Sequence, residues 1–148
     1  MGLGEGAQQI AKQALLFEEF LARATKAGQL EVFKTKLKPV EKPVLLHGHC
    51  HQKAFAAMPS VQKVLALVPE LKVEVIESSC CGMAGSFGYD AEHYQVSMQM
   101  AEASLLPKVR DADRNTLIVA DGTSCRHQIH DGAGREAIHV ARVLAQAL

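Results

Sequence analysis

Three short apolar runs, each followed within a few residues by cysteine, constrain the fold of this chain more than any other feature. They occupy residues 44–46, 73–76 and 116–120. Each run is aliphatic or β-branched and is bounded by residues that favour turns, which is typical of a buried strand. Segments with helical periodicity separate the runs, and this alternation is typical of βαβ units with right-handed crossovers. The sequence therefore predicts a single α/β domain with a mainly parallel sheet flanked by helices.

Apolar residues at helical spacing predict the elements around these strands. In this prediction, residues 1–43 form an N-terminal helix over 5–27, which ends at Gly28, and a connector over 29–43 that carries one edge strand. Residues 44–148 form the α/β unit that contains the cysteines. Its helices are expected at residues 61–68, at residues 94–105, where Pro107 ends the helix, and at residues 134–147.

Composition excludes several classes of protein. The 148 residues fit one domain, and a hydrophobic share of 48% is enough for a core. Sixteen basic and sixteen acidic side chains cancel, whereas a nucleic-acid-binding surface needs a basic excess. No apolar run approaches the ~20 residues of a membrane span, and the first residues lack the pattern of a signal peptide. We therefore expect a cytoplasmic protein with no nucleic-acid partner and no transmembrane segment.

The positions of the four cysteines predict one metal centre. Cys50 follows the first predicted strand, Cys80 and Cys81 follow the second, and Cys125 follows the third. The carboxyl ends of parallel strands lie at one edge of a sheet, which is where open α/β sheets bind ligands. A reducing cytoplasm disfavours disulfides, so clustered cysteines favour metal binding or catalysis. We predict that all four thiolates hold a metal at the carboxyl ends of the strands; ordinary buried thiols are the alternative.

Histidines and glycines beside the cysteines extend the predicted site. His47 and His51 flank Cys50, and a histidine can ligate a metal, carry protons or pack as a polar ring. Gly82 and Gly85 follow the cysteine pair, where glycine lets the backbone approach a cofactor and donate N–H groups to cluster sulfurs. A plain connecting loop is the alternative for these glycines. A cysteine nucleophile is a further alternative, but the chain has neither a G-x-S-x-G elbow nor a P-loop.

Three stretches of the chain together resemble the cysteine-rich CCG domain. They are residues 46–52 (LHGHCHQ), 79–88 (SCCGMAGSFG) and 121–128 (DGTSCRHQ). The CCG domain occurs in heterodisulfide reductase and in the iron–sulfur subunits of glycolate oxidase and anaerobic glycerol-3-phosphate dehydrogenase. The resemblance covers about residues 7–148 and is closest to the C-terminal domain of fused FAD-linked oxidases similar to D-lactate dehydrogenases.

The resemblance implies an electron-transfer domain of a flavin-dependent 2-hydroxy-acid dehydrogenase of the glycolate or D-lactate type. It implies a four-iron iron–sulfur cluster, cubane or non-cubane, with zinc as the alternative. FAD would lie only in a partner domain, a ferredoxin-like segment or subunit would pass electrons, and a quinone or another acceptor would receive them. The chain would be a C-terminal fragment of a larger protein, not catalytic by itself, and peripheral to the inner membrane only through partners. The competing expectation is a non-redox structural or docking module with a zinc site or free thiols.

One position departs from the family pattern. Relatives end this pattern in Cys-x-x-Cys, whereas this chain has Gly122 three residues before Cys125. The five-sulfur ligation of the non-cubane clusters in heterodisulfide reductase is therefore incomplete here. Four sulfurs still suffice for an ordinary four-iron cluster or for zinc, and a histidine can supply a fifth ligand. We expect that Gly122→Cys would place a new sulfur near the same centre.

Overall fold

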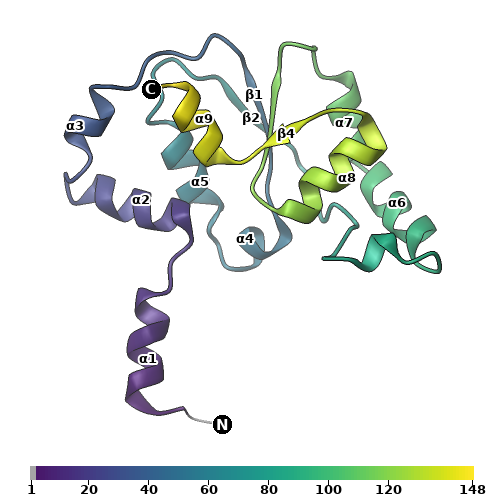
Figure 1. Cartoon of the computed structure of the whole chain (residues 1–148), viewed down its shortest axis with the longest axis horizontal. Coiled ribbons are helices and arrows are strands. Elements are labelled where there is room, and N and C mark those ends of the chain that lie inside the picture. The colour runs from purple at the N-terminus through teal and green to yellow at the C-terminus, as the bar shows by residue number, and fades with distance from the viewer. Residues whose placement is uncertain (1–2) are drawn as a thin grey trace.

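A four-stranded parallel sheet forms the centre of the computed structural model, which describes residues 3–148 (Figure 1). Its strand order is β2-β1-β3-β4, so β1 and β3 are central. The strands are β1 (Val44–His47), β2 (Val73–Val75), β3 (Leu117–Ala120) and β4 (Ala137–Ile138). The predicted single α/β domain with a parallel sheet flanked by helices is confirmed.

The register aligns the ends of the central strands. Val44 pairs with both Val73 and Leu117, and His47 pairs with Ala120, so β1 and β3 end side by side. Successive side chains of a strand point to opposite faces of a sheet. Leu45 and His47 therefore share a face, and Leu46 between them faces the other way, as Val44 does.

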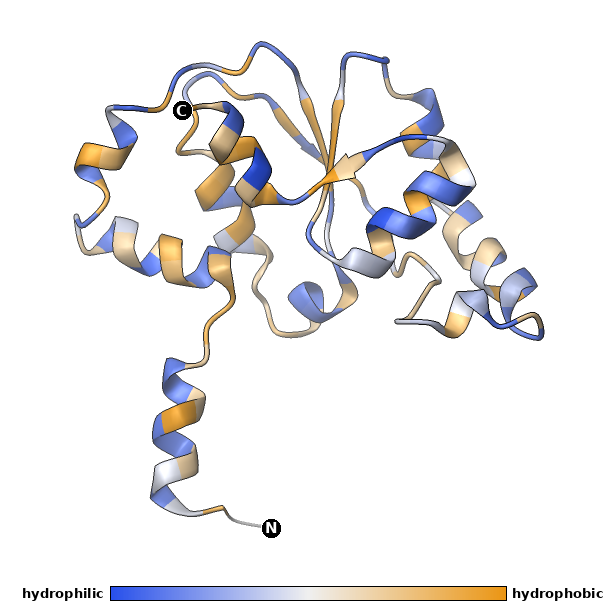
Figure 2. Ribbon diagram, viewed as in Figure 1, coloured by the Kyte–Doolittle hydropathy of each residue, from blue (hydrophilic) through white to orange (hydrophobic). Residues whose placement is uncertain are grey.

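Helices cover the first face of the sheet and enclose the larger core. They are α2 (Phe17–Lys26), α3 (Glu31–Lys34), α5 (Met58–Leu65) and α9 (Val140–Gln146). Leu46 and Val119 meet Val61, Leu65 and Val143 in this core. Figure 2 shows mostly apolar colour along the strands, whereas the helices carry both apolar and hydrophilic residues.

A second core lies on the opposite face and reaches the cysteines. Helices α6 (Tyr94–Glu102), α7 (Leu105–Asp111) and α8 (Thr123–Ala133) lie on this side of the sheet (Figure 1). Leu45 and Ile118 pack there with Val109, and the cluster includes Cys81 and Cys125. Two of the predicted site residues are thus part of a hydrophobic core.

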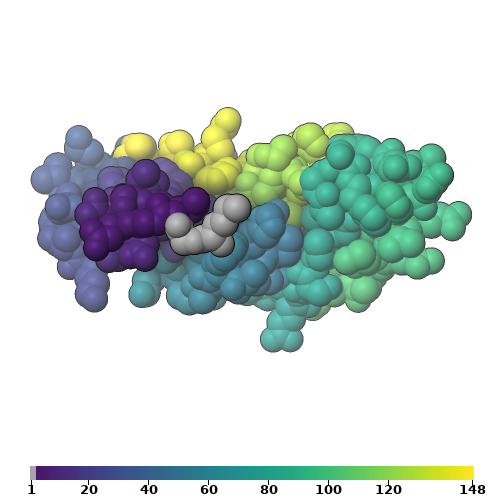
Figure 3. All heavy atoms as spheres, turned by 90° about the horizontal axis from the view of Figure 1, so that it is seen from below, coloured from purple at the N-terminus to yellow at the C-terminus, as the bar shows by residue number. Residues whose placement is uncertain are grey.

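The N-terminal part differs from the predicted single helix over residues 5–27. It forms α1 (Gly4–Gln13) and α2, separated by extended backbone at Leu16. The Glu19 carboxylate accepts a hydrogen bond from the Leu16 N–H at 2.9 Å, which satisfies the start of a new helix. Helix α1 buries no residue and projects from the body in Figure 1. In Figure 3, seen from below, its atoms lie in front of the body. The connector over residues 29–43 contains α3, so the predicted edge strand is wrong.

Two predicted helix boundaries are also wrong. Pro107 lies in the first turn of α7 and does not end a helix. Backbone N–H groups in the first turn of a helix have no intrahelical acceptor, so a proline there removes no hydrogen bond. Residues 134–147 are not one helix. Gly134 adopts φ +61° and ends α8, and β4 follows before α9. Helix α8 has a polar sequence and buries few residues. Its apolar residues therefore show too little helical periodicity to predict the helix from the sequence.

The described helices of this chain are short. The longest, α8, has 11 residues, and α1 and α2 have 10 each. A helix that crosses a bilayer needs about 20 apolar residues. Within residues 3–148, no helix has the length and apolar character of a membrane span.

We predict that shortening a side chain to alanine lowers the free energy of unfolding much more in the core than in α1. Leu46→Ala should lower the free energy of unfolding by about 2–5 kcal/mol, because it leaves a cavity between the sheet and its helices. Ile10→Ala, in a side chain that is 73% exposed, should change it by less than about 0.5 kcal/mol. Urea unfolding followed by circular dichroism measures both. A large loss for Ile10→Ala would show that α1 packs against the body.

Candidate metal centre

The end of β1 and the start of α4 (Cys50–Ala54) place the first two candidate ligands. His47 is fully buried and points to the same sheet face as Leu45. Gly48 follows, and a Cβ there would overlap the Met58 side chain, so the turn into the helix is tightly packed. Cys50 is the first residue of α4 and is half-buried. A short turn thus carries a buried imidazole and a thiol from one strand end.

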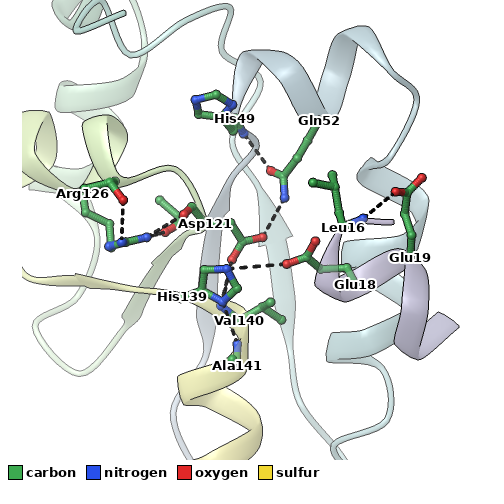
Figure 4. Close-up of polar contacts among 12 residues, drawn as sticks. Leu16, Glu18, Glu19, His49, Gln52, Asp121, Arg126, His139, Val140 and Ala141 are labelled. Carbon is green, nitrogen blue, oxygen red and sulfur yellow. Dashed lines mark hydrogen bonds and ion pairs between the residues drawn. The ribbon is translucent and has the colours of Figure 1, made fainter. Parts of the chain in front are cut away.

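Helix α4 is held by its own N-terminal hydrogen bonds and by the end of β3. His49 Nδ1 accepts a hydrogen bond from the His51 N–H at 3.2 Å, and Gln52 Oε1 accepts one from the His49 N–H at 3.0 Å. Gln52 Nε2 also donates to Asp121 Oδ2 at 2.8 Å, directly after β3 (Figure 4). This arrangement is a capping box that uses histidine and glutamine. It orients Cys50 relative to the adjacent strand.

Gly82 shapes the loop that carries Cys80 and Cys81. Its φ is +85°, and a Cβ there would overlap the carbonyl oxygen of Ser97 in α6. Only glycine fits both conditions comfortably. The Gly82 N–H points to Cys80 Sγ at 3.4 Å, the kind of contact expected for a backbone donor at a sulfur ligand. Gly85 also has positive φ, at +72°, but a Cβ there would meet open space.

Three of the candidate ligands converge. Cys125 lies in the first turn of α8, and its sulfur, the Cys81 sulfur and a ring nitrogen of His47 lie within 4.8 Å of one another. All three residues are buried. His47 Nδ1 makes a 2.8 Å hydrogen bond with Ser78 Oγ, whereas the buried Nε2 has no partner among the residues that the structure describes. A buried nitrogen without a partner costs stability, and metal-binding histidines are typically oriented through their other ring nitrogen.

The thiols influence one another strongly. A hydrogen bond with Cys125 lowers the pKa of Cys81, and the same hydrogen bond, with burial, raises the pKa of Cys125. Burial raises the pKa of Cys80, and the neighbouring Cys81 and Cys50 sulfurs act in the same direction. All four cysteines are free, so every thiol remains available as a ligand.

Lys53 is a site residue that the sequence prediction missed. Its Nζ donates hydrogen bonds to the carbonyl oxygens of Ser78 and Ser79, the latter at 3.0 Å, just before the cysteine pair. Burial lowers the pKa of Lys53, while the four thiols act to raise it. Because it lies three residues after Cys50, a helix beginning at Cys50 places both on neighbouring faces. That spacing was the available signal.

His51 lies outside the convergent group. It is exposed, and its ring packs edge-on against His49 with centroids 5.0 Å apart. The sequence places both His47 and His51 within three residues of Cys50. The structure separates them because β1 buries one and α4 directs the other to solvent.

A cluster of two carboxylates and a histidine lies beside α4 and was not predicted. Glu18, Asp121 and His139 approach one another beside a cavity of about 300 Å³ (Figure 4). Asp121 Oδ1 accepts the Val140 N–H at 2.8 Å, which caps α9, and burial raises the pKa of Glu18. His139 Nδ1 accepts the Ala141 N–H, so the neutral ring carries its proton on Nε2, which faces Glu18 at 3.6 Å. The cluster brings α2, the end of β3 and the start of α9 together.

Gly122 would admit a sulfur only if a neighbouring ring moved. Its φ is −68°, which any residue adopts. A Cβ there would lie 3.0 Å from Cys125 Sγ, consistent with the expected direction toward the centre. The same Cβ would overlap the His49 ring. Side-chain packing, and not backbone conformation, therefore opposes a cysteine at this position.

The chain is similar to segments of dehydrogenases. It is 32% identical over 112 residues to a subunit of the anaerobic glycerol-3-phosphate dehydrogenase of Escherichia coli strain K12, a match that covers 76% of this chain and 28% of that protein. It is 28% identical over 102 residues to the D-2-hydroxyglutarate dehydrogenase of the same organism, covering 68% of this chain and 10% of that one. The Pantoea ananatis D-2-hydroxyglutarate dehydrogenase is 25% identical over 135 residues, 90% of this chain and 12% of its own length. No family model and no solved structure matches the chain.

We predict that replacing Gly82 by alanine destabilises the fold more than replacing Gly85. Gly85→Ala should destabilise the fold by about 1–2 kcal/mol, the penalty of a left-handed residue with a Cβ. Gly82→Ala should cost more, because it adds an overlap with the Ser97 carbonyl to the same penalty. Urea unfolding of the two variants makes the comparison. Equal losses would contradict the close approach of α6 to this loop.

We also predict that His49 blocks a fifth sulfur. Gly122→Cys alone should take up no more metal than the wild type, whereas Gly122→Cys with His49→Ala should take up more, because the new sulfur then has room beside Cys125. Iron and zinc per chain after identical anaerobic reconstitution measure the effect. Gly122→Ser with His49→Ala is the matched control for space alone. Equal metal content in the cysteine and serine double variants would contradict the prediction.

Proposed function

We propose that this chain is the electron-transfer domain of a flavin-dependent 2-hydroxy-acid dehydrogenase of the glycolate or D-lactate type. In this proposal it holds a four-iron iron–sulfur cluster, cubane or non-cubane. The convergence of His47, Cys81 and Cys125 at the carboxyl ends of the strands carries the proposal. The proposed ligands are Cys50, Cys80, Cys81, Cys125, His47 and His51, with Gly82 and Gly85 next to the cluster.

The residues present fit a metal or cluster. The unpartnered Nε2 of His47 lies buried among thiols, so a metal would supply the partner that the described residues lack. Cys50 and Cys80 lie at the margin of the same group, half-buried and close enough for the Cys50 sulfur to affect the pKa of Cys80. His51 lies at the exposed rim, beyond His49. Soft thiolate ligands favour iron–sulfur clusters and zinc over hard cations.

The chain's own residues would hold and tune the centre. When bound, an iron–sulfur cluster accepts and releases single electrons. The Ser78 hydroxyl orients the His47 ring, and the Gly82 N–H faces the Cys80 sulfur. Burial of Cys81 and Cys125 keeps water away from the ligands, and such hydrogen bonds and burial are what set a cluster's potential.

The proposed setting is a larger dehydrogenase. The similarity to short segments of much longer dehydrogenases supports it, because the chain spans less than a third of the length of these relatives. We propose a CCG-type domain over residues 44–148, preceded by the helical segment over residues 1–43. Its partners would be an FAD-linked oxidase domain, a ferredoxin-like segment or subunit and a quinone or other acceptor. The assembly would be cytoplasmic and peripheral to the inner membrane.

Zinc is the second candidate, and one observation favours it. The sulfurs of Cys81 and Cys125 and the His47 nitrogen lie within 4.8 Å of one another, a spacing close to that around a single tetrahedral ion. In that case the chain would be a structural or docking module without redox chemistry.

Anaerobic reconstitution with iron and sulfide tests the proposal. The wild type should become brown and bind about four irons and four sulfides per chain. Cys81→Ser, Cys125→Ser and His47→Gln should each lose most of this iron, because each removes a buried group from the convergent set. Metal analysis and visible absorbance measure the outcome.

The control variant is His130→Gln, which replaces an exposed histidine of α8 that pairs with Glu136. It should bind as much iron as the wild type. A colourless protein with one zinc per chain would support the docking module instead. Iron content unchanged by Cys81→Ser and Cys125→Ser, in variants that remain folded by circular dichroism, would contradict the proposed ligands.

A further inference from the structure

Lys53 joins two of the segments that carry the proposed ligands. It extends from α4, which begins at Cys50, to the loop before Cys80. Its acceptors are the Ser78 and Ser79 carbonyl oxygens and, at 3.4 Å, the Ser78 hydroxyl. The ammonium group therefore joins the helix that begins at Cys50 to the loop that leads into Cys80.

The hydrogen bonds suit the charged form of this lysine, which offers one N–H donor to each of the three acceptors. An ammonium has three N–H donors and no acceptor, and carbonyl oxygens can only accept. The same Ser78 hydroxyl bonds to His47 Nδ1 at 2.8 Å, so a continuous chain of contacts runs from Lys53 to the buried imidazole. The aliphatic stem is also confined, because a Cβ at Gly48 would lie 3.0 Å from Lys53 Cε. The side chain is anchored at both ends.

The charge of Lys53 lies beside the cysteine pair, because its Nζ is 3.0 Å from the carbonyl oxygen of Ser79, the residue before Cys80. Each of the four cysteine sulfurs acts electrostatically on it, and burial reduces the screening by solvent. A cation next to a cluster of thiolates stabilises added negative charge, including an added electron. A surface lysine would have no such effect, since exposed charges are screened by water and salt.

We propose that Lys53 is a positioning residue that locks the Cys80–Cys81 loop onto α4 and raises the reduction potential of the centre. This inference rests on the proposed function, because it assigns the lysine a role toward the cluster. The hydrogen bonds hold two ligand-bearing segments in register, and the positive charge favours the reduced state. The lysine touches no substrate and transfers no electron itself.

Two variants test both roles of the lysine, the potential reporting on its charge and the hydrogen exchange on its contacts. Lys53→Met keeps the stem and removes both charge and hydrogen bonds, while Lys53→Arg keeps the charge and donors. Lys63→Met, at an exposed lysine of α5, is the matched control. The wild type and the three variants are reconstituted anaerobically, and the potential of the bound iron is measured by spectroelectrochemistry. The same proteins without metal are compared by amide hydrogen exchange over residues 78–83.

The expected result is a more negative potential and faster exchange in Lys53→Met, with Lys53→Arg and Lys63→Met close to the wild type. A purely structural role would lower iron occupancy without moving the potential of the iron that remains, and this result would overturn the proposed effect on potential. Unchanged exchange in Lys53→Met would overturn the proposed lock. The exchange comparison needs no metal, so it decides the lock even if the wild type binds no iron, an outcome that counts against the proposed function.

Discussion

Parallel pairing between β1 and β3 is the constraint on which the candidate site depends. Because His47 pairs with Ala120, the two central strands end at the same level, and the segments that follow them begin side by side. Helix α4 starts at Cys50 and helix α8 starts two residues before Cys125. A shift of one residue between these strands would turn His47 toward the opposite core, away from the thiols.

The loops at this edge are held by contacts between segments that lie far apart in the sequence. Gln52 bonds to Asp121, and Asp121 also caps α9, so hydrogen bonds link the start of α4, the end of β3 and the start of α9. On the other side, the close approach of α6 to Gly82 sets the path of the cysteine loop. The hydrophobic cores provide the stability, and these polar contacts set the positions of the sulfurs.

The site combines groups that are costly to bury with others that offset the cost. A histidine nitrogen without a partner among the described residues and four free thiols are unusual contents for the edge of a core, whereas a half-buried ammonium nearby balances negative charge. Proteins retain such arrangements most often at functional sites. Similarity to segments of dehydrogenases is consistent with a redox role for this edge of the sheet.

The sequence by itself determined the three main strands, the α/β class and the grouping of cysteines at one sheet edge. These follow from local patterns, since short apolar runs form buried strands and parallel strands end together. Local patterns could not reveal α8 or β4, because one is a polar helix and the other has two residues that pair only when β3 is already in place. Tertiary structure alone decided that His47 enters the thiol group while His51 faces solvent, that Lys53 reaches the cysteine loop, and that His49 fills the space beside Gly122. Each of these depends on contacts between segments far apart in the chain, whose distances are set by packing and not by sequence spacing.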